Sequence, residues 1–216
     1  PASSCLPTDG AIPARPRGLP AQALDLGAVY TAPLHPPVGG GPAGGAGIAP
    51  GRRCWIPPGH QRLLGVDYDL RGVLELRNPG DAAAATAARA RTGTGTLPVP
   101  PGLYASGHVL GMLGPLRQLH EGAVADLVFH YRDGSTASVP LRSAPSPTYM
   151  LGDDYVLPPG LRTALATPQA DALFAEEVRN PHPAREVVAV EIRARPSLPA
   201  AAVLSVFAVT MEPSPR

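Results

Sequence analysis

The sequence predicts an all-β fold, an antiparallel β-sandwich of the jelly-roll type, and three features carry this prediction. Residues 122–141 contain two runs of alternating apolar and polar residues around Asp133-Gly134, the strongest short-range signal of a β-hairpin. Residues 186–195 alternate in the same way, and 200–211 form an almost continuous apolar run that suits a buried strand. Because a hairpin with one apolar face needs a second sheet to cover it, two packed sheets are expected.

The part of the chain before the hairpin supplies further strands. Residues 1–23 read as a proline-rich N-terminal arm, and 24–30 as the first strand. The alternation over 63–77 is interrupted at Gly72, which indicates a bulge or a bend. Residues 97–114 read as a strand, a Pro-Gly turn and a second strand.

Segments of biased composition separate these strands. The Gly/Pro-rich segment 36–50 and the Ala-rich segment 81–96 are predicted to be loops, and 143–168 is rich in loop signals. The Asn-Pro-His-Pro sequence at 180–183 indicates a turn before the last strands. We therefore expect a single β-sandwich domain over 24–213.

Composition restricts the class of partner and the location. The net charge is +1, and all 18 basic residues are dispersed arginines, so no phosphate-binding stripe and no nucleic-acid partner are expected. No apolar run reaches 18 residues, so no membrane span is expected. The sequence starts at Pro1 rather than at a methionine, which suggests a processed chain, and we expect a secreted, extracellular protein.

The two cysteines fit an oxidising environment. A disulfide between Cys5 and Cys54 would close a loop of about 50 residues, which the chain-entropy model credits with about 4 kcal/mol. A disulfide would also hold down the N-terminal arm. Two buried free thiols are the alternative.

No catalytic pattern stands out in the sequence. There is no Gly-x-Ser-x-Gly motif, and neither Ser106 nor Ser135 lies in the context of an activated nucleophile. Asp67 and Asp69 share one face of a strand and are expected to face solvent rather than form a catalytic pair. The chain is therefore expected not to be an enzyme.

Metal binding is expected to be absent or limited to a structural calcium ion. The six histidines lack the close spacing of zinc ligands. Asp153 and Asp154 offer oxygen ligands for calcium in a loop, and a solvated acidic turn is the alternative. No other cofactor is expected.

Several segments together carry a resemblance to a known group of proteins. They are 66–73 (VDYDLRGV), 99–104 leading into 107–110, 131–135 (YRDGS), and 180–183 before Glu186. In this order they resemble secreted galactose-binding-like β-sandwich modules, which occur beside bacterial and fungal glycoside hydrolases. The resemblance covers roughly the last two thirds of the chain, which lacks the tryptophan-rich segment that follows the hairpin in that group. It implies a module that binds a glycan or a cell-wall polysaccharide.

Sugar binding requires an aromatic face beside planar polar groups, and aromatic residues are few in this chain. Tyr104, Tyr149 and Tyr155 lie in or next to predicted loops, with Asp153 and Asp154 as acceptors for sugar hydroxyls. These five residues are the predicted ligand set, and packing in the core or at its rim is the alternative for each tyrosine.

The sequence thus leads to three functional hypotheses. The first is a non-catalytic extracellular carbohydrate-binding or cell-surface accessory module. The second is a structural subunit of a self-assembling extracellular polymer or coat, in which the N-terminal arm docks on a neighbouring copy by strand addition. The third is a glycan-active enzyme.

Overall fold

The computed structural model describes residues 11–35, 55–80, 91–92, 94–114, 122–142, 157, 159–166, 172–199 and 202–215. Strands make up the regular structure of these residues, and none of them is helical. The strands are β1 (Ala32–Pro33), β2 (Gly59–Leu63), β3 (Val66–Leu70), β4 (Gly72–Arg77), β5 (Arg91–Thr92), β6 (Thr94–Gly114), β7 (Ala125–Tyr131), β8 (Thr136–Leu141), β9 (Leu161–Ala166), β10 (Ala172–Arg179), β11 (Glu186–Ala194) and β12 (Val203–Pro213).

Strand β6 belongs to both sheets of the sandwich. Its first half pairs with β11, which continues to β7 and β8, and we call these strands the outer sheet. Its second half pairs with β12 on one side and β10 on the other, and with β4 and β9 these form the central sheet. Every pairing is antiparallel except that of β4 with the short β5. The predicted antiparallel β-sandwich is confirmed, while its jelly-roll connectivity stays a prediction.

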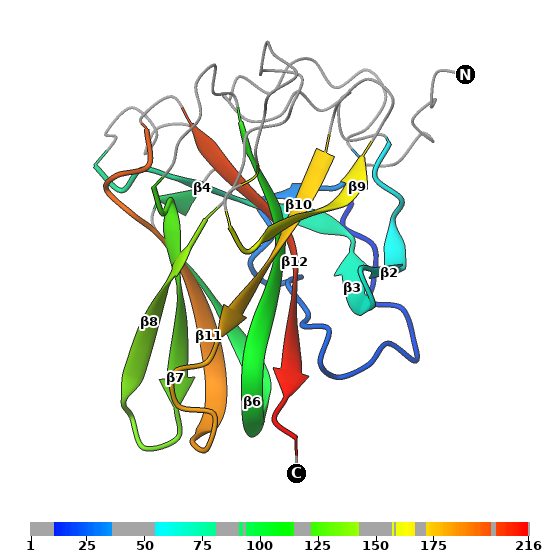
Figure 1. Cartoon of the computed structure of the whole chain (residues 1–216). Coiled ribbons are helices and arrows are strands. Elements are labelled where there is room, and N and C mark those ends of the chain that lie inside the picture. The colour runs from blue at the N-terminus through cyan, green and yellow to red at the C-terminus, as the bar shows by residue number, and fades with distance from the viewer. Residues whose placement is uncertain are drawn as a thin grey trace.

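Two hydrophobic cores lie on the two faces of the central sheet. The inter-sheet core fills the space between the central and outer sheets, with Leu76, Phe129 and Val209 among its members. The second core lies on the opposite face, where Phe207 and Phe174 pack with Tyr68 of the β2–β3 hairpin. Figure 1 shows the resulting order, with β7 and β8 on one side of β6 and β12 and the β2–β3 hairpin on the other.

The predicted hairpin is confirmed as β7 and β8, with its tight turn at Asp133-Gly134. Gly134 has a φ of 83°, which a glycine adopts without strain. The turn is closed by hydrogen bonds from the Gly134 amide to the Tyr131 carbonyl (3.0 Å) and from the Tyr131 amide to the Ser135 carbonyl (2.9 Å). The predicted bend at Gly72 is also present, because β3 ends at Leu70 and β4 begins at Gly72.

Three of the predicted elements differ in the structure. Residues 24–30 are not a strand, because only Ala23 forms a bridge, to Thr210, before the chain turns. The two strands expected over 97–114 form one continuous strand, β6, which passes between the sheets near Gly102. The loop expected over 81–96 ends earlier, since 91–92 and 94–96 lie in β5 and β6.

Candidate functional site

A groove lies where β6 passes from the outer sheet to the central sheet, and we call it the corner groove. Its volume is about 370 Å³. The lining comes from the N-terminal segment, β6 and the end of the chain: Gln22, Gly102, Leu103, Tyr104, Pro213, Ser214 and Pro215. Leu103 is 49% exposed, which leaves an apolar side chain open to solvent at this groove. Concave, mostly apolar surfaces of this volume with a few polar groups are typical of small-ligand sites.

Backbone hydrogen bonds hold the walls of the corner groove together. The Ser214 amide donates to the Leu103 carbonyl (3.0 Å), which ties the end of the chain to β6. The Met211 amide donates to the Gln22 carbonyl (2.9 Å), which ties the N-terminal segment to β12. The three walls are therefore fixed relative to one another, as a preorganised site requires.

Tyr104 is the one predicted ligand residue that lies among the described residues. Its side chain is buried in the inter-sheet core, and its hydroxyl donates to the Pro100 carbonyl (2.7 Å). Burial raises the pKa of the Tyr104 phenol. Tyr104 thus lines the corner groove with little exposed surface and does not stand open on a loop.

The Asn180 side chain connects strands β7 and β6 next to the corner groove. The Asn180 side-chain oxygen accepts hydrogen bonds from the Tyr131 hydroxyl (2.6 Å) and the His182 amide (3.0 Å). Its side-chain nitrogen donates to the Tyr104 carbonyl (2.8 Å). The His182 ring packs edge-on against Tyr131, with ring centroids 5.7 Å apart. The sequence indicated the Asn-Pro-His-Pro turn, but it carried no sign that the Asn180 side chain joins both sheets.

The side chains of Ser106, His108 and Glu212 contact one another where β6 pairs with β12 in the central sheet. One oxygen of Glu212 contacts both the Ser106 hydroxyl (3.0 Å) and His108 Nε2 (3.1 Å), and these hydrogen bonds lower the pKa of Glu212. A catalytic triad instead needs the histidine to contact serine and carboxylate through different nitrogens. Ser106 is also only 1% exposed, so the cluster suits a structural role.

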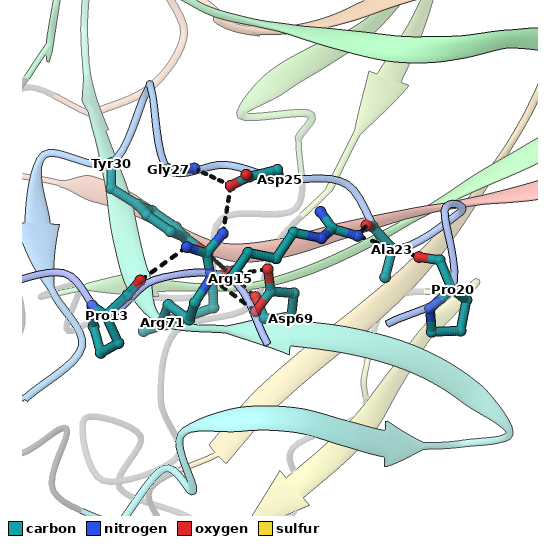
Figure 2. A network of polar contacts seen from close by, with 10 residues as sticks. Pro13, Arg15, Pro20, Ala23, Asp25, Gly27, Tyr30, Asp69 and Arg71 are labelled. Carbon is teal, nitrogen blue, oxygen red and sulfur yellow. Dashed lines mark hydrogen bonds and ion pairs between the residues drawn. The ribbon is translucent and has the colours of Figure 1, made fainter. Parts of the chain in front are cut away.

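Arg71 is the centre of a buried polar network at the edge of the central sheet (Figure 2). Its Nε donates to both carboxylate oxygens of Asp69, each at 2.9 Å. Its other nitrogens contact Asp25 and the Pro13 carbonyl, which lies 2.9 Å away. Burial disfavours the charge of Arg71, but the two carboxylates keep its pKa above the ordinary value. This network fastens the N-terminal segment to β3 and β4.

The prediction that Asp67 and Asp69 face solvent is wrong for Asp69, which is buried against Arg71. Asp67 is partly exposed and pairs with His60 Nε2 (2.8 Å) across the β2–β3 hairpin. Alternation along a strand cannot reveal such burial, because Arg71, the partner of Asp69, is held in turn by Asp25 and the Pro13 carbonyl of the N-terminal segment.

The other predicted site residues lie outside the described part of the chain. They are Tyr149, Asp153, Asp154, Tyr155, Cys5 and Cys54. The tyrosine–aspartate ligand set, the calcium site and the disulfide therefore stay predictions.

Contacts at Arg142 connect the end of β8 to β10 and to Pro159, which lies just before β9. The Arg142 amide donates to the Glu176 carboxylate of β10 (2.6 Å), and its guanidinium donates to the Pro159 carbonyl (3.2 Å). Glu176 is buried, and burial raises the pKa of its carboxyl to about 7 although the Arg142 amide opposes this shift. Sequence reasoning missed Glu176, since its neighbour Glu177 on the same strand is exposed and no pattern distinguishes the two.

No protein-family model matches the chain, and no curated protein matches it significantly. The described residues contain no group of three or more histidine, cysteine, aspartate or glutamate side chains that could hold a metal ion. Over the same residues, no helix has the length and hydrophobicity needed to cross a membrane.

Proposed function

We propose that this chain is a non-catalytic extracellular accessory module that binds carbohydrate. The observation that carries the proposal is the corner groove, which combines exposed apolar surface with a small number of polar groups. The C–H face of a sugar ring packs against apolar surface, while its hydroxyls need fixed hydrogen-bond partners. Leu103, Pro213 and Pro215 supply the first kind of surface. The Gln22 side chain supplies the second, together with the Ser214 hydroxyl, which donates to the Pro183 carbonyl (3.1 Å) and can still accept a hydrogen bond.

Two observations favour this proposal over assembly by strand addition. Proline lacks an amide donor, and Pro98 and Pro100 lie in the first half of β6, which pairs with β11 alone among the described strands. Pro140 lies in β8, at the other edge of the outer sheet. Prolines at both edges discourage the addition of a strand from another copy.

The N-terminal segment also argues against docking on a neighbouring copy. Leu24 donates its amide to the Val209 carbonyl (2.9 Å), and Arg71 holds the Pro13 carbonyl. Residues 11–30 are therefore bound to the chain's own sheet. Docking of this segment on another copy would require the Arg71 network to break.

A change at the groove tests the proposal. A glycan array first identifies an oligosaccharide, and calorimetric titration then compares wild type with Leu103→Asp. We expect Leu103→Asp to weaken binding by about tenfold or more, because a charge replaces apolar contact surface that is worth about 1.5–3 kcal/mol when fully buried. Leu64→Asp is the matched control, since Leu64 is the other exposed large hydrophobic residue among the described residues and lies on the β2–β3 hairpin.

Titration of Tyr149→Ala and Tyr155→Ala separates the corner groove from the predicted ligand loop. Loss of binding in these variants, with binding intact in Leu103→Asp, would move the site to the loop. A well-folded chain that binds no glycan on the array would refute the proposed function.

A further inference from the structure

Among the described residues, Arg77 is a buried arginine without an ion-pair or hydrogen-bond partner. It lies at the end of β4 and is only 6% exposed. Its Nε is fully buried without a hydrogen bond, and within the described residues its guanidinium forms no ion pair. Buried charges in proteins are normally paired, because an uncompensated one loses its hydration without replacement. The described residues therefore offer no acceptor to the Arg77 Nε.

Ser205 presents a second unused donor on the same face of the central sheet. Its hydroxyl is fully buried and has no hydrogen-bond partner. Ser205 lies opposite Glu75 in the β12–β4 pairing, and Arg77 is two residues further along β4. Because Leu74 and Leu76 point into the inter-sheet core, Glu75 and Arg77 point to the other face. Diagonal neighbours of this kind lie about 7–8 Å apart, within reach of a long side chain.

We propose that Arg77 and Ser205 form a binding site for an oxyanion, the carboxylate or sulfate group of a ligand. Both groups act as donors here, so the ligand must supply at least two acceptor oxygens. A guanidinium presents its N–H groups in a planar fork that matches the oxygens of such a group. Acids with this group include uronic acids and sulfated sugars, but the site does not depend on the corner groove.

Glu75 is the carboxylate that could compete with such a ligand. It shares the face of Arg77 but takes part in another interaction, and no ion pair joins these two described residues. The Glu75 amide also bonds the Thr31 hydroxyl (3.0 Å), which fixes this part of β4. An anion that binds Arg77 therefore does not have to displace an existing ion pair.

The test uses inorganic sulfate and acetate as probes, with chloride at equal ionic strength as the reference. We expect a saturable rise in the urea midpoint of the whole chain with sulfate, acetate or both, since a ligand that binds only the folded state stabilises it. The anion that acts more strongly distinguishes a sulfate site from a carboxylate site. In NMR titrations the Nε–H signal of Arg77 should shift along the same binding curve.

Variants then assign the response to these two residues. Arg77→Met should abolish it, and Ser205→Ala should weaken the affinity by about tenfold, as expected for a lost hydrogen bond to a charged group. Arg179→Met is the control, because Arg179 is 89% exposed on β10 and should leave the response unchanged.

Three results would overturn the proposal. They are the same midpoint in sulfate, acetate and chloride, an unshifted Arg77 Nε–H signal, and a response that Arg179→Met removes. If Arg77→Met fails to fold, Ser205→Ala and the wild-type NMR titration still decide. None of these readouts involves a glycan, so the outcome is independent of the proposed function.

Discussion

The central and outer sheets of this sandwich are buried to different extents. Strand β12 of the central sheet is buried at nine consecutive positions, and β4 is buried along its whole length. In the outer sheet, exposed and less exposed residues alternate along β8, and the first half of β6 alternates between exposed and buried residues. The difference arises because, among the described residues, the central sheet has a hydrophobic core on each face, whereas the outer sheet has a core on one face.

This comparison explains the two kinds of strand pattern in the sequence. A strand with one solvated face alternates between apolar and polar residues, and a strand covered on both faces reads as a continuous apolar run. The second core depends on the β2–β3 hairpin and on residues that precede it in the chain, which include Leu34 and Ile56. Both sheets therefore depend on long-range packing for the inter-sheet core, and the central sheet depends on it again for the core on its other face.

The largest expected effect comes from the second core. Phe207→Ala should lower the free energy of unfolding by about 3–5 kcal/mol, because it leaves a cavity under the β2–β3 hairpin. Thr96→Ala, on the exposed face of the outer sheet, should stay within about 0.5 kcal/mol of wild type. Urea unfolding of both variants measures the contrast. Equal losses would contradict the difference in burial between the sheets.

A smaller effect on the free energy of unfolding depends on pH and tests the burial of Glu176 between the two sheets. Glu176 has a pKa of about 7 in the folded state, above its ordinary value of 4.5, because it is buried. A raised pKa means that its contribution to stability is complete below about pH 4.5 and is lost as pH rises through 7. Glu176→Gln should therefore be more stable than wild type at pH 8, by up to about 3 kcal/mol.

Urea unfolding at pH 5 and pH 8 measures this difference. Glu177→Gln is the matched control, because Glu177 is the next residue on β10 and is exposed. If wild type and Glu176→Gln show the same change in stability between the two pH values, Glu176 does not titrate in this range.

The smallest expected effect concerns the turn of the outer sheet. Gly134→Val should cost about 1–2 kcal/mol, because it places a β-branched residue at a φ of 83°. Gly134→Asn is the control and should cost less, since asparagine tolerates this conformation better. A denaturant midpoint that Gly134→Val leaves unchanged would show that the turn relaxes freely and does not fix the register of β7 and β8.

Much of the candidate site could not be read from the sequence. Tyr104 was predicted as a ligand residue from its place beside a Pro-Gly pair, and it does line the corner groove. Gln22 and Pro213 line the same groove from opposite ends of the chain, and no local pattern connects them. The same holds for Arg77 and Ser205. They come close together, buried and without partners among the described residues, only when β4 and β12 pair.

The sequence by itself determined the strands whose burial is set locally. Alternation and the Asp133-Gly134 pair were sufficient for β7, β8 and β11, because side-chain period and turn conformation are properties of the adjacent residues. Only the tertiary structure decided that β6 joins both sheets, that Asp69 is buried against Arg71, and that Glu176 lies between the sheets. These outcomes depend on contacts between residues far apart in the chain, where the desolvation of a charged group is set by whichever distant segment covers it.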